Sequence, residues 1–172
     1  DTKRTHDEHL RLLRWLEPEH DTRLVRDLVQ KLRQRDRPLY CIWSGRRLRD
    51  QFDVDHCLPF AAWPCNDLWN LFPSSPSVNR NKSNKLPSAE SLEGARVNII
   101  DWWQSVYMEE EDLTARFASE AIAALPGITS SSATPSPEAV FEGLMMQRAT
   151  LKRDQQLEEW DLRHETAKNT LN

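Results

Sequence analysis

Apolar residues recur at helical spacing over most of the chain, and strand-like alternation is confined to its middle. In the first forty residues, leucines repeat at intervals of three and four within two segments that end at Pro18 and Pro38, which predicts two helices. Thr5 and Glu8 have the spacing of a capping box, and Asp21 can cap the second helix. Four further helices are predicted: about Ser77 to Lys85, a long helix capped by Ser88, Asp112 to Ala124, and about Glu138 to His164.

The segment between these helices has the pattern of short strands. Leu39 to Trp43 and Arg46 to Arg49 flank Ser44-Gly45, which predicts a β-hairpin. A second strand is predicted from Asp53 to Leu58, and a third from Asn70 to Phe72. We therefore expect an α+β fold in which a small ββα core, with a preceding β-hairpin, is flanked by N- and C-terminal helices.

This pattern divides the chain into five parts. Residues 1–38 form an N-terminal helical segment, 39–87 the core, and 88–125 a helical extension. Residues 126–137 are rich in Ser, Thr and Pro, which is typical of a flexible linker, and residues 138–172 form a C-terminal helix and tail.

Composition limits the class of protein. The 172 residues fit one medium domain, or a small core with helical extensions, and contain no apolar run of about 18 residues that could span a membrane. The three cysteines form no C-x-x-C pair, which favours a reduced, intracellular chain over a disulfide framework. The first residue is Asp1, so we expect a processed form or the ordered part of something longer.

Charge is distributed unevenly although the net charge is only −4. Residues 1–40 carry ten Lys and Arg against eight Asp and Glu, residues 41–87 carry six against four, and residues 88–172 carry seven against fifteen. A polyanion would therefore meet the first half of the chain, while the last half would face water or another protein.

The stretch "FDVDHCLPF" places Asp53, Asp55 and His56 in a strand that is otherwise apolar. Buried carboxylates need a positive partner, either a basic side chain or a metal ion. Asn70 opens the next strand, and Asn79 begins the following helix with Lys82 one turn later on the same face. Carboxylate and amide oxygens suit Mg²⁺, and an imidazole beside them could act as general base.

These residues resemble the ββα-metal, or HNH, nuclease motif. The similarity covers about Cys41 to Pro87 and is strongest to HNH domains of CRISPR effectors and to stand-alone bacterial HNH proteins. The namesake positions are His56, Asn70 and Asn79, at intervals of fourteen and nine residues.

The resemblance implies a metal-dependent endonuclease that hydrolyses DNA phosphodiester bonds. His56 would activate water, Asp55 and Asn79 would hold one Mg²⁺, for which Mn²⁺ can substitute, and Asn70 would brace the loop that orients His56. Lys82 or Arg80 would stabilise charge on the phosphate, and Asp53 is either a surface carboxylate or a helper of the metal ligands. The residues expected to contact the nucleic-acid backbone are Arg46, Arg47, Arg49, Arg80 and Lys85.

The cysteine content sets this chain apart from many HNH proteins, and the limited base reading of HNH units suggests that the chain works within a larger complex. Only Cys41 remains of the two C-x-x-C pairs that hold a structural zinc, since Ser44, Ser75 and Val78 stand in the other places, so no structural zinc is expected. An HNH unit reads few bases, so we expect targeting by other subunits or domains of a prokaryotic, cytoplasmic defence or CRISPR-type effector. A non-catalytic nucleic-acid-binding or scaffolding module of such a complex is the alternative.

Overall fold

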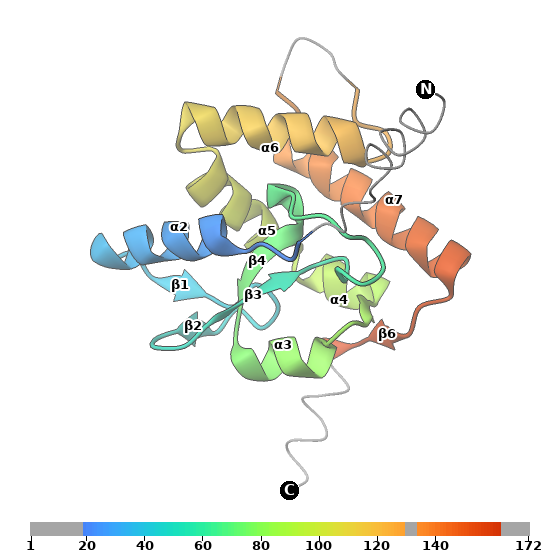
Figure 1. Cartoon of the computed structure of the whole chain (residues 1–172), viewed down its shortest axis with the longest axis horizontal. Coiled ribbons are helices and arrows are strands. Elements are labelled where there is room, and N and C mark those ends of the chain that lie inside the picture. Colours follow the sequence, from blue (N-terminus) through green and yellow to red (C-terminus); the bar gives the residue numbers. More distant parts are fainter. Residues whose placement is uncertain (1–18, 130–133, 163–172) are drawn as a thin grey trace, which may run out of the picture.

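The computed structural model describes residues 19–129 and 134–162. It confirms the α+β class, because within these residues three pairs of short strands lie among helices that make up most of the molecule (Figure 1). The predicted helix that ends at Pro18 lies outside the described residues.

Helix α2 (Arg23–Gln34) forms because its apolar residues share one face. Val25, Leu28, Val29 and Leu32 are buried on that face. The N-cap is Thr22 rather than Asp21, and the Asp21 carboxylate instead accepts a hydrogen bond from the backbone N–H of Arg23.

The predicted hairpin is present, with shorter strands than expected. Strand β1 (Leu39–Tyr40) pairs antiparallel with β2 (Arg47–Leu48), and Gly45 occupies the left-handed region at φ 65° in the connecting turn. Strand β1 ends early because the chain turns toward a neighbouring strand, where the N–H of Ile42 donates to the carbonyl of Pro73.

Strand β3 (Asp53–His56) pairs antiparallel with β4 (Leu71–Ser74), with Asp53 opposite Ser74 and His56 opposite Leu71. Asn70 does not open β4 as predicted, because it ends a short 3₁₀ helix, η1 (Leu68–Asn70). Helix α3 (Pro76–Lys82) follows, capped by the Ser75 hydroxyl, and ends at Ser83, which has φ 50°. The predicted helix therefore starts one residue earlier and ends three residues earlier than expected.

The long helix predicted after Ser88 consists of three parts. The Ser88 hydroxyl caps α4 (Ala89–Gly94) as predicted, and α5 (Arg96–Trp102) continues into a π-helical segment, η2 (Trp103–Tyr107). Gly94 ends the first part, as expected from the weak helix propensity of glycine. Helix α6 (Glu111–Ala124) agrees with its prediction.

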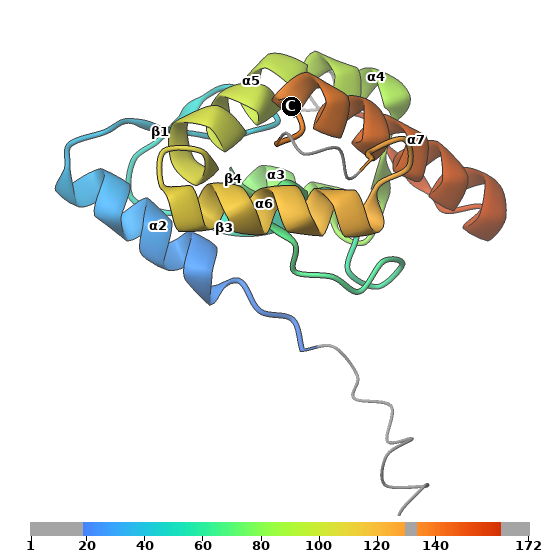
Figure 2. The same ribbon diagram turned by 90° about the horizontal axis from the view of Figure 1, so that it is seen from above.

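The C-terminal helix is shorter than predicted and is followed by a strand. Helix α7 (Pro137–Gln155) ends where Gln156 adopts the left-handed conformation, and the chain then returns as β6 (Glu159–Trp160). Strand β6 pairs in parallel with β5 (Leu86–Pro87), directly after α3. Helices α4, α5 and α7 lie side by side along one side of the molecule (Figure 2).

The core joins the ββα unit to the later helices. Its largest fully buried aromatic side chains are Trp69, Phe72, Trp103, Tyr107, Phe117 and Phe141. The Tyr107 hydroxyl donates to the carbonyl of Leu71, which fixes η2 against β4. None of the described helices is both long enough and apolar enough to span a bilayer.

Candidate catalytic site

A cavity of about 630 Å³ opens beside β3, between the start of α2 and α3. Five of the predicted site residues line this cavity: Asp53, Asp55, His56, Asn79 and Arg80. His20, Arg26 and Phe60 also contribute to its walls. The structure therefore brings the predicted acid, imidazole, amide and one cation together at one place.

Asp55 is neutralised by a lysine. Its side chain is almost fully buried, and its Oδ1 lies 3.0 Å from Nζ of Lys82, which is fully buried. The indole Nε1 of Trp43 donates to Oδ2 at 2.6 Å. Burial raises the pKa of the Asp55 carboxyl, while Lys82 and Trp43 oppose this effect. Of the two positive partners that the sequence allowed, the structure places the basic side chain beside Asp55.

Lys82 lies behind the cavity rather than in it. Besides Asp55, its ammonium donates to the backbone carbonyl of His56 at 2.7 Å and lies 5.7 Å from the ring centre of Trp43. These contacts tie α3 to β3 and leave no Lys82 surface exposed. This placement does not agree with the expected contact between Lys82 and a substrate phosphate, whereas the alternative, Arg80, is exposed and lines the cavity.

The Trp43 that holds Asp55 is itself supported by the C-terminal part of the chain. Trp160 in β6 contacts Trp43 edge to face, with ring centres 5.3 Å apart. Strand β6 is fixed in turn because Arg148 of α7 donates to the carbonyl of Pro87 and pairs with Glu159.

His56 is held by a side chain that the sequence did not single out. Its Nε2 lies 3.2 Å from Oδ1 of Asn66, and the same oxygen accepts the backbone N–H of Asp21 at 3.0 Å. An amide oxygen can only accept, so we assign the proton to Nε2, which leaves Nδ1 as an acceptor. Burial lowers the pKa of His56 to about 4, so the imidazole is neutral at neutral pH.

The chain before α2 closes over this histidine. The Asn66 amide nitrogen donates to the carbonyl of Glu19 at 2.7 Å, and the ring of His20 lies 4.6 Å from that of His56. Phe60 contacts both imidazoles, with ring centres 5.1 Å from His20 and 5.2 Å from His56. No pattern in the sequence indicates His20, and Asn66-Asp67 has the composition of an ordinary loop.

Asn70 makes the backbone contacts expected of it. Its Oδ1 accepts the N–H of Leu58 at 2.8 Å, its Nδ2 donates to the Leu58 carbonyl at 3.2 Å, and the residue is fully buried. The loop that follows His56 is thereby attached to the residue before β4.

Asn79 and Asp53 contact each other at the cavity wall. The Asn79 amide nitrogen donates to Oδ2 of Asp53 at 3.0 Å, which leaves the amide oxygen of Asn79 for another partner. Across the described ranges, no group of three or more His, Cys, Asp and Glu side chains could hold a metal ion. The Asp55 carboxylate and the Asn79 amide oxygen, which line the same cavity, are of the ligand types that Mg²⁺ prefers in proteins.

The other predicted cations lie outside the cavity. Arg46, Arg47 and Arg49 are exposed on the hairpin, and the last two line a separate groove of about 330 Å³ with Arg33 and Arg37. Lys85 pairs with Glu158 at 2.7 Å.

The three cysteines are small side chains packed at least partly inside the protein. Cys41 is buried, with its Sγ 3.7 Å from the hydroxyl of Ser74. Cys57 is also buried, and burial raises its pKa to about 12. The same effect raises the pKa of the half-buried Cys65 to about 12.

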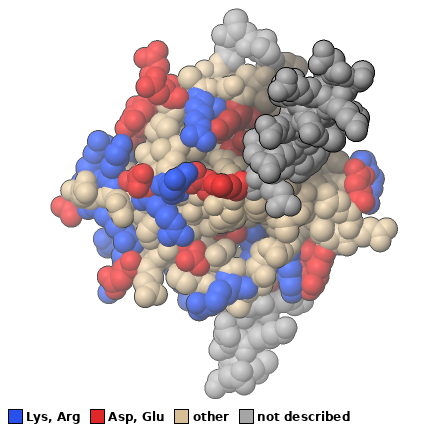
Figure 3. Space-filling view, in the orientation of Figure 1, with Lys and Arg blue, Asp and Glu red and all other residues tan. Residues whose placement is uncertain are grey.

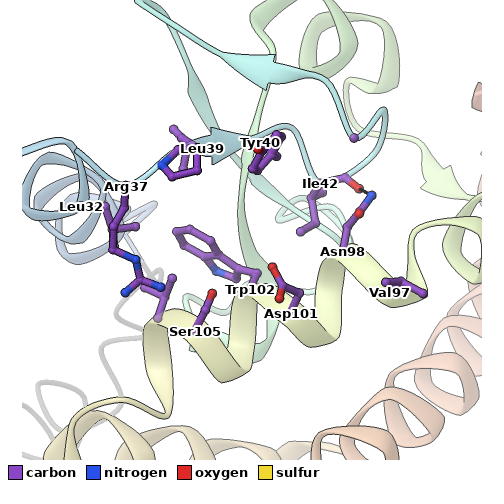
Figure 4. A pocket seen from close by; sticks show the side chains of 13 residues that line it. Leu32, Arg37, Leu39, Tyr40, Ile42, Val97, Asn98, Asp101, Trp102 and Ser105 are labelled. Atoms are coloured by element: carbon purple, nitrogen blue, oxygen red, sulfur yellow. Dashed lines mark hydrogen bonds between the residues drawn. The ribbon is translucent and has the colours of Figure 1, made fainter. Parts of the chain in front are cut away.

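A second groove, of about 360 Å³, lies between β1 and α5 (Figure 4). Trp102 lies across it in the figure, and two of the polar side chains that line the groove are engaged, since Arg37 pairs with Glu109 and Asn98 donates to the carbonyl of Ile42. It contains no histidine, so the cavity beside β3 is the candidate catalytic site.

Comparison with known families agrees with this geometry. A search of curated proteins found no match. Residues 41–88 match the family profile described as HNH endonuclease, a segment that contains Asp55, His56, Asn70 and Asn79. The expected resemblance is thereby confirmed: this segment is similar to an HNH endonuclease domain and indicates a nuclease-type function.

Proposed function

We propose that this chain is a metal-dependent endonuclease that hydrolyses DNA phosphodiester bonds. The observation that carries the proposal is the neutral His56 imidazole, held through Nε2 by Asn66 in a cavity shared with Asp55 and Asn79. A neutral imidazole with a free acceptor nitrogen can take a proton from water, which is the first requirement of phosphodiester hydrolysis.

The proposed base is Nδ1 of His56. Water loses a proton to this nitrogen as its oxygen forms a bond to phosphorus, and the bond from phosphorus to the 3′ oxygen breaks. The 3′ oxygen leaves and is protonated, so the products carry a 5′ phosphate and a 3′ hydroxyl. Asn66 keeps the imidazole in the required tautomer by accepting from Nε2.

Asp55 and Asn79 would hold one Mg²⁺, with Mn²⁺ as a substitute. A bound divalent ion stabilises negative charge on the phosphate and the leaving oxygen. Asp53 accepts from the amide nitrogen of Asn79, which leaves the amide oxygen of Asn79 for the ion. Each Asp55 oxygen has two lone pairs, so the bonds from Trp43 and Lys82 do not prevent it from binding an ion.

Lys82 and Asn70 act as positioning residues in this proposal. Lys82 bonds to both the Asp55 carboxylate and the His56 carbonyl, which fixes the end of β3. Asn70 fixes Leu58, two residues after His56. Arg80, exposed in the cavity wall, is placed to contact the scissile phosphate.

The setting that we propose is a nuclease domain of a larger prokaryotic defence complex, including CRISPR-type effectors, in which other subunits or domains choose the target. The cavity residues of the matched segment that we assign to catalysis would act on the phosphodiester backbone, and contacts to the backbone do not distinguish one base from another.

Cleavage of supercoiled plasmid tests the proposal. We expect nicked or linear DNA with Mg²⁺ or Mn²⁺ and no cleavage with EDTA. Asn79→Ala should raise the Mg²⁺ concentration needed for half-maximal rate, whereas Asn84→Ala, at an exposed position in the same cavity wall, should not. DNA binding without cleavage under any divalent ion would contradict the proposal and favour the non-catalytic scaffold.

A further inference from the structure

The described arginines fall into two groups, according to whether a carboxylate pairs with them. Those with a carboxylate partner are Arg23, Arg37, Arg96, Arg116, Arg148 and Arg153. Those without one among the described residues are Arg26, Arg33, Arg35, Arg46, Arg47, Arg49 and Arg80. The second group lies in or next to α2, the hairpin and α3. Figure 3 shows Lys and Arg side chains gathered on this face toward α2 and the hairpin.

Two of these arginines are held in place by an aromatic ring. The guanidinium of Arg33 lies 5.1 Å from the ring centre of Phe52, and that of Arg26 lies 5.8 Å from it. Arg33 also donates from Nη1 to the carbonyl of Asp50, while its Nη2 is buried and has no hydrogen-bond partner among the described residues. Stacking on an aromatic face orders a guanidinium without using its outward N–H groups.

The same two arginines connect the catalytic cavity with the groove beside the hairpin. Arg26 lines the cavity that contains His56, and Arg33 lines the groove that contains Arg47 and Arg49. Phe52 contacts both arginines and directly precedes β3. Arg33 follows Arg26 by seven positions in α2, which is a rise of about 10 Å along the helix axis. That distance matches about three nucleotides of one DNA strand at about 3.4 Å each.

We infer that Arg26, Arg33, Arg47 and Arg49 form an arginine track that binds the phosphate backbone of duplex DNA as it leaves the catalytic cavity. The inference rests on the proposed function, and it adds helix α2, outside the matched segment, to the substrate-binding surface. The chemistry fits phosphates, because a planar guanidinium group can bind two phosphate oxygens at once and these four have no carboxylate partner within residues 19–129 and 134–162. Among the described residues, Asp36 is the one carboxylate that lines the groove.

Binding in EDTA tests the track without cleavage. Fluorescence anisotropy with a labelled DNA duplex would be recorded over a series of KCl concentrations for the wild type and for Arg26→Gln/Arg33→Gln. The matched control is Lys31→Gln/Arg35→Gln, which removes the same charge at exposed positions of the α2 region that line neither hollow. We expect the track variant to bind at least tenfold more weakly and to lower the salt slope of log K by about 2, because two phosphate contacts are lost. The control variant should lower the salt slope by less than about half of the change seen with the track variant.

Three outcomes separate this inference from the nuclease proposal. Equal effects of the two double variants would overturn the track in favour of diffuse charge. Unchanged DNA binding by the track variant, with melting temperature preserved, would overturn it in favour of another partner, such as an acidic protein. If the track variant loses DNA binding as expected but the wild type never cleaves DNA with Mg²⁺, the track stands and the nuclease proposal fails. A second variant, Phe52→Leu, keeps an apolar side chain but removes the ring, and should weaken binding about threefold through loss of stacking.

Discussion

The two sides of strand β3 use charge in opposite ways. Behind the cavity, Lys82 is buried and bonded to the His56 carbonyl and to the carboxylate of Asp55, a cavity-lining residue that also accepts from Trp43. In front, Arg26 and Arg80 line an open cavity without carboxylate partners among the described residues. The paired charges fix the positions of the catalytic groups, and the unpaired ones remain available to a ligand.

The largest effect is expected on the open side, from His56→Ala. Removing the general base should reduce cleavage by about 10²- to 10⁴-fold or more, because proton transfer from water then has no acceptor. Single-turnover cleavage of a labelled duplex measures this. Thermal unfolding and DNA binding should stay close to wild type, and a variant with near wild-type turnover would remove His56 from the mechanism.

On the closed side, Lys82→Met should destabilise the fold strongly. Asp55 would be left buried without its cation, which typically costs about 3–5 kcal/mol. Urea unfolding gives the free energy, and Lys31→Met, at an exposed position of α2, is the matched control with little expected change. A loss no larger than the control's would show that the Asp55–Lys82 pair does not fix this side of β3.

An intermediate effect is expected from Asn66→Ala, which removes the hydrogen-bond partner that positions His56 in the open cavity. Without Asn66 the imidazole can rotate and adopt either tautomer, so kcat should fall by about tenfold to a hundredfold. Asn84→Ala controls for general changes in the cavity wall. Imidazole ¹⁵N shifts should change from the Nε2-protonated pattern to a mixture, and an unaltered pattern would contradict the assigned role.

The smallest effects distinguish paired from unpaired surface cations. Arg80→Gln should lower the salt slope of DNA binding by about 1, as expected for one lost phosphate contact. Lys85→Gln should change it much less, since Lys85 already pairs with Glu158 and an exposed pair contributes little. Equal slopes for the two variants would show that pairing does not decide which cations bind DNA.

The sequence predicted the local parts of this molecule better than the contacts between distant parts. The ββα order, the hairpin and the cap at Ser88 follow from short-range patterns, and so does the meeting of Asp55, His56 and Asn79. The direction of Lys82 was not predictable, because one-turn spacing from Asn79 does not say which face of α3 packs on β3.

Long-range contacts account for the rest of the difference. The contact of Asn66 with residues 19–21 and the contact of Trp160 with Trp43 join segments far apart in sequence, and no local pattern signals them. The end of α7 was also missed, because pairing of β6 with β5 competes with continued helix in a charged, helix-favouring sequence.

The termini of the cleaved DNA show whether His56 activates water to hydrolyse a phosphodiester bond. The wild type would be incubated with plasmid and Mg²⁺ in water enriched in ¹⁸O, and the product termini would be analysed by mass spectrometry. We expect ¹⁸O in a 5′ phosphate, an unlabelled 3′ hydroxyl, and no product with His56→Ala or EDTA. Products with a 3′ phosphate and a 5′ hydroxyl, or equal cleavage by His56→Ala, would contradict this mechanism.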